Sequence, residues 1–140
     1  MVNSKASVTW NGALSDGHGE VRLDSSGAAT LPVNWRARSQ GSDSVTTPEE
    51  LLGAAHAACF AMALSHALEG NGTPPTQLDV TASVGFTPGV GITGSHLTLR
   101  AQIPGLDEAS FERFVDEAKE GCPVSVALSG IEITLDATLA

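Results

Sequence analysis

The chain has 140 residues, of which 41% are hydrophobic and 16% charged, a size that suits one globular domain with its own core. Its formal net charge is −9, and its seven Lys and Arg residues form no basic stripe, which argues against a nucleic-acid partner. The start, MVNSKASVTWNG, does not resemble a signal peptide. The longest weakly polar run, residues 51–64, is shorter than the roughly 20 residues of a membrane span. We therefore expect a cytoplasmic protein that has no membrane partner and keeps its two cysteines as thiols or as a working redox pair.

The first third of the chain predicts strands followed by a long helix. Residues 5–12 and 18–24 alternate polar and apolar side chains around the turn-rich SDGHG, which indicates a hairpin. Residues 28–39 form a weaker strand candidate, interrupted by a proline. Thr47 then provides an N-cap, followed by a proline and two glutamates, and Glu50 stands where a capping box requires it. The helix that begins here should run to about Leu68, and it is apolar nearly all round, which is typical of a central helix.

The remaining residues predict a mixture of strands and helices. Residues 75–86 and 92–105 alternate well and predict two longer strands, whereas residues 106–121 have the spacing of an amphipathic helix. A short helix over 123–130 and a last strand over 131–139 complete the chain. The order is not a repeating βαβ series, so we expect an α+β fold in which antiparallel sheets wrap around a buried central helix, as a single domain over residues 1–140.

The two cysteines, Cys59 and Cys122, stand in different environments. Cys122, in GCPVSVAL, occupies an N-cap-like position before a proline, where backbone N–H groups and the helix dipole favour the thiolate. Cys59 lies in the middle of an apolar helix, where burial should raise its pKa. The residues alone therefore name Cys122 as the nucleophile. Two unpaired core cysteines are the alternative, because free cysteine is among the most buried residue types.

A cation near Cys59 would stabilise its thiolate. Glu49 is a natural partner for such an arginine, but ten residues of continuous helix would place it about 15 Å from Cys59. Either the helix starts late, or Glu49 serves a sulfur on another subunit; compensation of the helix dipole is the simpler role for this carboxylate. The candidate arginines are Arg22, Arg36, Arg38 and Arg100.

His56 stands three residues before Cys59 and could join the two cysteines in binding a metal. No further ligand is apparent, and a histidine in a buried helix is more commonly a hydrogen-bonded core residue. We therefore assign no metal and no cofactor.

The segment TPEELLGAAHAACFAMALS, followed by GCPVSVAL, resembles the OsmC/Ohr family of thiol peroxidases, and more closely its OsmC (osmotically inducible) branch. The resemblance spans nearly the whole chain. It implies that Cys59 is the peroxidatic sulfur and Cys122 the resolving one, which reverses the order given by the residues alone. It also implies an arginine and a glutamate beside the first cysteine, for which Arg38 and Glu49 are the best matches, with Arg36 as the alternative arginine. The resemblance further implies an intertwined homodimer with active sites at the subunit interface.

The expected function is the reduction of organic hydroperoxides, and of hydrogen peroxide, through a Cys59 sulfenic acid and a Cys59–Cys122 disulfide. The family resemblance implies a dithiol reductant, such as a lipoyl-type one, to restore the thiols. The alternatives are a non-catalytic redox sensor that uses the same cysteine pair, and a scaffold with inert thiols.

Overall fold

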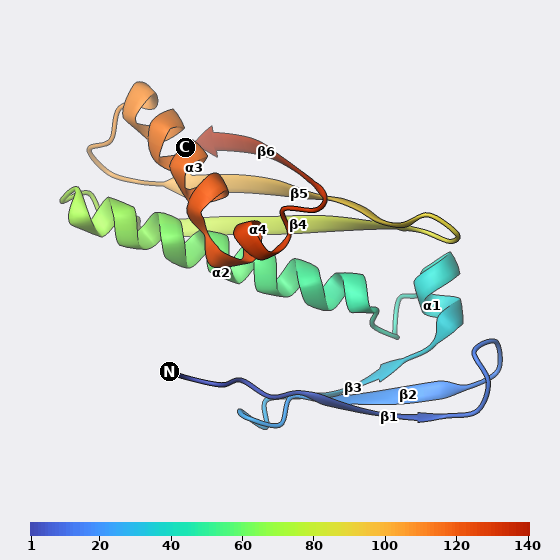
Figure 1. The fold of residues 1–140 in the computed structure, drawn as a ribbon. Coiled ribbons are helices and arrows are strands. Elements are labelled where there is room, and N and C mark those ends of the chain that lie inside the picture. The colour runs from blue at the N-terminus through green and yellow to red at the C-terminus, as the bar shows by residue number, and fades with distance from the viewer. The chain divides into compact units, whose positions relative to one another are not determined.

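The computed structural model describes all 140 residues and divides the chain into two compact units, Met1–Leu51 and Leu52–Ala140. The boundary falls within the first turns of one long helix, α2 (Pro48–Gly70). Figure 1 labels the elements along the chain. Helices and strands are mixed without a repeating order, so the predicted α+β class is confirmed.

The first unit is built on a three-stranded antiparallel sheet. Its strands are β1 (Ser7–Asn11), β2 (His18–Arg22) and β3 (Thr30–Val33), paired in the order β1-β2-β3, which confirms the predicted hairpin.

The predicted strand over residues 28–39 is wrong in its second half, which forms the helix α1 (Trp35–Gln40). Asn34 starts this helix, because its side-chain oxygen accepts a hydrogen bond from the Ala37 N–H at 2.7 Å. The strand therefore ends at Val33, and Arg38 lies on a helix.

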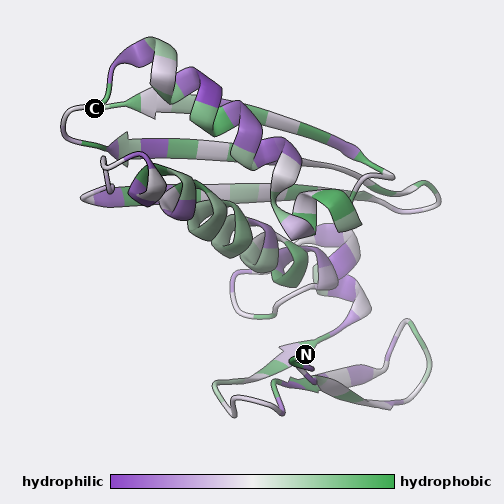
Figure 2. Cartoon of the chain, turned by 60° about the vertical axis from the view of Figure 1, so that its left-hand side comes forward, coloured by the Kyte–Doolittle hydropathy of each residue, from purple (hydrophilic) through white to green (hydrophobic).

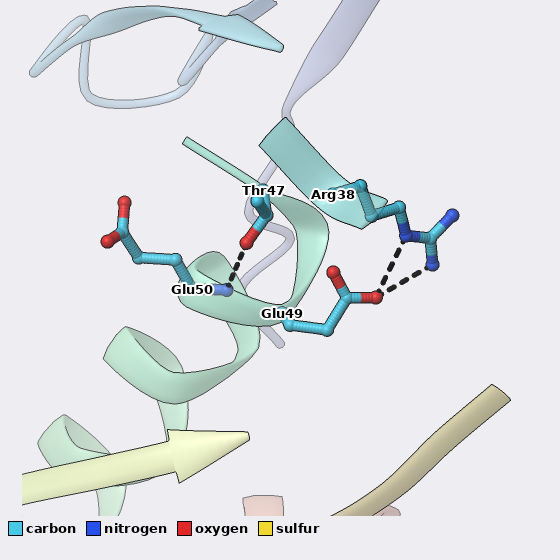
Figure 3. A network of polar contacts seen from close by, with 4 residues as sticks. All are labelled: Arg38, Thr47, Glu49 and Glu50. Carbon is cyan, nitrogen blue, oxygen red and sulfur yellow. Dashed lines mark hydrogen bonds and ion pairs between the residues drawn. The ribbon is translucent and has the colours of Figure 1, made fainter. Parts of the chain in front are cut away.

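The start of α2 follows the capping signals in the sequence. The Thr47 hydroxyl accepts a hydrogen bond from the Glu50 N–H at 3.0 Å (Figure 3). The Glu50 carboxylate, however, accepts from the neighbouring Thr46 hydroxyl instead of closing a capping box. The helix is continuous from Pro48 to Gly70, which confirms the predicted start and excludes the alternative in which the helix starts late. Just after the helix, Gly72 takes a positive φ of 78°, which suits glycine at a helix end.

The second unit contains the sheet β4-β5-β6, with β4 (Gln77–Thr87), β5 (Gly91–Gln102) and β6 (Glu132–Leu139). The β4 and β5 strands pair antiparallel, as expected, but β6 runs parallel to β5. Two helices, α3 (Glu108–Gly121) and α4 (Pro123–Ala127), lie between β5 and β6 in the chain. Such a helical crossover returns the chain to the end of the sheet at which β5 began, and this return makes the pairing parallel.

The core of the second unit lies where α2 and α3 meet the sheet. Buried residues of α2 occur at helical spacing, and α3 buries one apolar face, as expected for the predicted amphipathic helix. Figure 2 shows α3 with hydrophilic and hydrophobic bands, whereas α2 is hydrophobic along most of its length. The buried cluster comprises Phe60, Leu64 and Leu68 of α2; Leu97, Leu99 and Ala101 of β5; Ile103, directly after β5; Phe111, Phe114, Val115 and Ala118 of α3; and Cys122.

Only one side of α2 is buried within the chain, although its sequence is apolar nearly all round. Met62, on another side, is 72% exposed. By length and composition alone α2 could cross a membrane, a test that the core helix of a soluble protein also passes. The apolar helix, Pro48–Gly70, is thus longer than the weakly polar run over residues 51–64 that was considered as a membrane span in the sequence. Its packed side carries His56, which is buried and hydrogen-bonded to two other elements of the second unit, as a core helix requires.

Candidate active site

Cys122 lies at the junction of two helices, as the C-cap of α3 and the N-cap of α4. Pro123 follows it at the first position of α4, and the extended backbone of Cys122 (φ −64°, ψ 133°) directs its sulfur to the start of that helix. The Cys122 Sγ accepts a hydrogen bond from the Ser125 N–H at 3.3 Å and lies 3.2 Å from the Ser125 hydroxyl oxygen. The N-cap position expected from GCPVS is therefore confirmed.

Cys59 reaches the same place from the middle of α2. Its Sγ accepts a hydrogen bond from the Val124 N–H at 3.5 Å, so consecutive N–H groups at the start of α4 hold the two sulfurs. Each thiol affects the pKa of the other, so the two sulfurs are neighbours, and both are free rather than joined in a disulfide. The second unit thus brings together two sulfurs that are sixty-three positions apart in the chain.

The surroundings of the two thiols shift their pKa values in opposite directions. Burial raises the pKa of Cys59, and Cys122 raises it further, against the lowering effect of the Val124 N–H. Burial also opposes ionisation of Cys122, but hydrogen bonds from Ser125 and Cys59 outweigh it and leave the pKa of Cys122 below its ordinary value. Within one unit, then, Cys122 is the sulfur that ionises more readily, in agreement with the argument from the residues alone.

His56 lies fully buried beside the thiols and uses both of its ring nitrogens. Nδ1 lies 2.7 Å from the Ser95 hydroxyl of β5, and Nε2 lies 2.8 Å from the Ser125 hydroxyl of α4. Burial lowers the pKa of the imidazole, which favours its neutral form. His56 is therefore a hydrogen-bonded core residue, which was the favoured interpretation of its position.

Arg38 and Glu49 form an ion pair in the first unit. The Arg38 Nε and Nη2 donate to one oxygen of the Glu49 carboxylate at 2.9 and 2.8 Å (Figure 3). The Glu49 side chain is buried, whereas that of Arg38 is one third exposed. Arg36, the alternative arginine, is exposed on the same short helix. The pairing of Arg38 with Glu49 favours Arg38 for the role that the resemblance implies.

A cavity of about 470 Å³ lies beside Arg38 in the first unit. Arg38 is the only charged residue of its lining, and apolar side chains from all three strands make up most of the wall. The cavity can take an apolar group and present one guanidinium to it. Its larger apolar lining residues are Val8, Trp10, Leu14, Val21, Val33, Trp35 and Leu51.

Two functional candidates, Ser125 and Ser95, were missed in the sequence. Ser125 stands three residues after Cys122 in CPVS, where a helix N-cap sulfur meets the backbone N–H of the third helical residue. This spacing could have identified it. Ser95 lies thirty-nine positions from His56 and has no local signal, because only the pairing of β5 with its neighbours brings it to the helix.

The α+β fold, the adjoining thiols and the arginine–glutamate pair define a protein of the thiol redox class. Residues 41–136 match a protein family described as OsmC-like protein. The chain is 41% identical to peroxiredoxin OsmC from Escherichia coli K12 over 96% of this chain and 95% of that protein. It therefore belongs to the OsmC-like family, and the resemblance stated from the sequence is confirmed.

Other relatives and solved structures agree with this assignment. An organic hydroperoxide resistance protein from Xanthomonas axonopodis pv. citri is 37% identical over 64% of this chain and 65% of its own length. The crystal structure of an organic hydroperoxide resistance protein OsmC from Legionella pneumophila matches with a TM-score of 0.70 and 28% identity, covering 99% of this chain and 98% of that one. The crystal structure of an organic hydroperoxide resistance protein from Elizabethkingia anophelis matches with a TM-score of 0.74 and 27% identity, covering 100% of this chain and 98% of that one.

Proposed function

We propose that the chain is a thiol-dependent hydroperoxide reductase, in which Cys59 attacks the peroxide and Cys122 resolves the product. The observation that carries this proposal is the contact between two free thiols of unequal exposure: Cys59 is partly exposed and Cys122 is 0% exposed. The names of the relatives, peroxiredoxin and organic hydroperoxide resistance protein, support the same reaction class.

Exposure favours Cys59 as the first nucleophile, even though its pKa is the higher of the two in the single chain. A hydroperoxide must reach the sulfur before any chemistry begins, and Cys122 is enclosed by its own unit. The lowered pKa of Cys122 suits the second step, because a resolving thiol also reacts as the thiolate. Peroxide thus reacts at Cys59, and the neighbouring Cys122 reacts only once Cys59 has been oxidised.

The reaction balances in three steps. The Cys59 thiolate attacks the terminal peroxide oxygen, the O–O bond breaks, and the leaving alkoxide takes a proton to become the alcohol, which leaves Cys59 as sulfenic acid. The Cys122 sulfur then attacks the Cys59 sulfur, forming the disulfide and releasing water. A dithiol reductant, for which a lipoyl-type molecule is the expected class, reduces this disulfide by exchange and becomes a disulfide itself.

Arg38 supplies the positive charge that Cys59 lacks within its own unit, and Glu49 holds the guanidinium in place. Because α2 is continuous, the ten residues between Glu49 and Cys59 correspond to a rise of about 15 Å. One chain therefore does not bring its own Glu49 to its own Cys59 along this helix. A homodimer in which each Arg38–Glu49 pair serves the Cys59 of the partner satisfies the geometry, with residues 1–140 of each copy acting as one OsmC-like domain.

The apolar cavity beside Arg38 supports an organic hydroperoxide as the substrate. Its wall would take the hydrocarbon group while the guanidinium donates to the peroxide oxygen on which negative charge builds. Hydrogen peroxide fits the same site but gains nothing from the apolar wall. A reducing cytoplasm is the compartment in which the dithiol cycle is maintained.

Two cysteine variants test the assignment. Cys59→Ser should abolish consumption of cumene hydroperoxide, whereas Cys122→Ser should form one sulfenic acid per chain, trapped by dimedone, and then stop. The matched measurement is steady-state turnover of the wild type with dihydrolipoamide. Oxidation of the wild type that ends after one equivalent despite the reductant would indicate a redox sensor, and full activity of Cys59→Ser would overturn the order of the cysteines.

A further inference from the structure

A buried chain of hydrogen bonds leads from the resolving thiol into the core of the second unit. It runs from the Cys122 Sγ to the Ser125 hydroxyl at 3.2 Å, then to the His56 Nε2 at 2.8 Å, and from the His56 Nδ1 to the Ser95 hydroxyl at 2.7 Å. All four side chains are buried, none being more than 4% exposed. The four residues come from α2, β5 and the α3–α4 junction, so this hydrogen-bond network forms only when the second unit is folded.

The four hydrogen-bonded residues include no carboxylate, lysine or arginine. The ionisable groups in or beside this network are Cys122 at the helix junction and Cys59 on α2, and β5 contributes the Ser95 hydroxyl. Burial lowers the pKa of the His56 imidazole and so favours its neutral form. The imidazole is consequently neutral in the resting protein and has one nitrogen free to accept a proton.

The hydroxyl of Ser125 can pass a proton between Cys122 and His56. In the thiol form, the sulfur donates to the Ser125 oxygen, the Ser125 hydroxyl donates to Nε2, and Nδ1 donates to Ser95. If the thiol proton moves to the Ser125 oxygen and the Ser125 proton moves to Nε2, the result is a Cys122 thiolate and a His56 imidazolium. The thiolate then accepts a hydrogen bond from the Ser125 hydroxyl, and the imidazolium donates one to the Ser125 oxygen. The buried network keeps zero net charge in both forms, and so it avoids the cost of an isolated buried thiolate.

We propose, on the basis of the function above, that His56 is a positioning residue for the resolving step: through Ser125 it receives the proton that Cys122 gives up when its sulfur attacks the Cys59 sulfenic acid. The S–S bond forms as the S–OH bond breaks, and the leaving hydroxide takes a proton from solvent to become water. His56 then releases its proton and returns to the neutral form. The sulfenic sulfur is reduced, the Cys122 sulfur is oxidised, and the products are the disulfide and water.

A single-turnover experiment tests this role. Reduced protein is mixed with one equivalent of cumene hydroperoxide without reductant, and the Cys59 sulfenic acid is quantified with dimedone over time and across pH. His56→Gln keeps hydrogen-bonding capacity but accepts no proton, so the decay of the sulfenic acid should slow at least about tenfold at neutral pH. It should recover as pH rises and hydroxide removes the Cys122 proton directly. Formation of the sulfenic acid should not change.

Two further variants distinguish the proposed proton transfer from Cys122 through Ser125 to His56, called the relay below, from a general loss of packing. His96→Gln is the matched control, because His96 also bonds a hydroxyl, that of Thr134 at 2.6 Å, but does not reach Cys122; its resolving rate should equal the wild type. Ser125→Ala, which leaves His56 bonded to Ser95, should slow the same step even if His56→Gln does not fold. In the Ser125→Ala background, His56→Gln should slow it no further.

The relay is overturned by an unchanged resolving rate in His56→Gln, by an equal slowing at every pH, or by additive effects in the double variant.

A second measurement does not depend on peroxidase activity. In Cys59→Ser, Cys122 is the sole thiol, and its thiolate absorbance can be titrated. His56→Gln should move the titration midpoint upward by about one pH unit; an unmoved midpoint would overturn the relay, whereas absent peroxide turnover in the wild type would overturn only the proposed function.

Discussion

At the scale of single residues, Arg38 and Arg36 provide a matched pair on one short helix. Arg38 is bonded to the buried Glu49, whereas Arg36 is exposed. Under the proposed function, Arg38→Ala should remove the cation that stabilises the Cys59 thiolate and should lower the rate of sulfenic acid formation at neutral pH at least about tenfold. Stopped-flow measurement with cumene hydroperoxide across pH gives this rate.

Arg36→Ala is the control for Arg38→Ala and should retain the rate of the wild type. The Arg38→Ala rate should approach the wild-type rate as pH rises, because hydroxide then ionises Cys59 without help from the arginine. Equal losses in both variants, or an unchanged pH profile in Arg38→Ala, would remove Arg38 from the proposed role.

His56 should also make the stability of the protein depend on pH. Burial lowers its pKa in the folded state, whereas the unfolded chain takes up a proton near the ordinary value of 6.5. Below that value the unfolded state binds more protons, so the free energy of unfolding should fall as pH falls, by at most about 1.4 kcal/mol per pH unit for one proton. Urea unfolding of the wild type and His56→Gln at about pH 7.5 and 5.5 measures this, and the variant should show the smaller change.

At the scale of elements, local signals in the sequence were sufficient for most of the helices. The start of α2 and the apolar face of α3 follow from capping residues and helical spacing, which are properties of neighbouring positions. The helix α1 was missed because the strand candidate was extended through residue 39, whereas the local signal for the helix is the single capping residue Asn34. The parallel pairing of β6 depends on the crossover through α3 and α4, which no strand pattern encodes.

The distinction between local signals and contacts made by the tertiary fold also applies to the candidate site. The junction at Cys122 could be predicted because a cysteine before a proline is a local signal. The contact between Cys59 and Cys122, and the bond between His56 and Ser95, join segments that only the tertiary fold brings together. The family resemblance, not the residues alone, suggested the first of these contacts.

The capping interaction at the start of α2 has a measurable energy. Thr47→Ala leaves the Glu50 N–H without its hydroxyl partner and should lower the free energy of unfolding by about 1 kcal/mol. Ser129→Ala, at an exposed position, is the control and should change it by less than about 0.5 kcal/mol. Urea unfolding compares the two variants, and an equal effect would mean that the cap contributes nothing.

At the scale of the whole molecule, α2 exposes apolar side chains that a soluble monomer would normally cover. Its buried residues lie along one stripe, while Met62 is 72% exposed on another side of the same helix. Large exposed apolar surfaces commonly mark interfaces between proteins. The homodimer that we propose from the continuous helix and the Arg38–Glu49 pair would cover this surface with a second copy of the chain.

Met62→Glu tests the homodimer directly. A carboxylate placed on the exposed side of α2 would have to be buried in the interface without a partner, which costs several kcal/mol, and so the dimer should dissociate at micromolar concentration. Val90→Glu, in the turn between β4 and β5 and 76% exposed, is the control that adds the same charge outside the helix. Sedimentation velocity should give a monomer for Met62→Glu and a dimer for both Val90→Glu and the wild type. Because each Cys59 would lose the partner's Arg38, peroxide reduction by Met62→Glu should fall together with the dimer, and a fully active monomer would contradict the shared site.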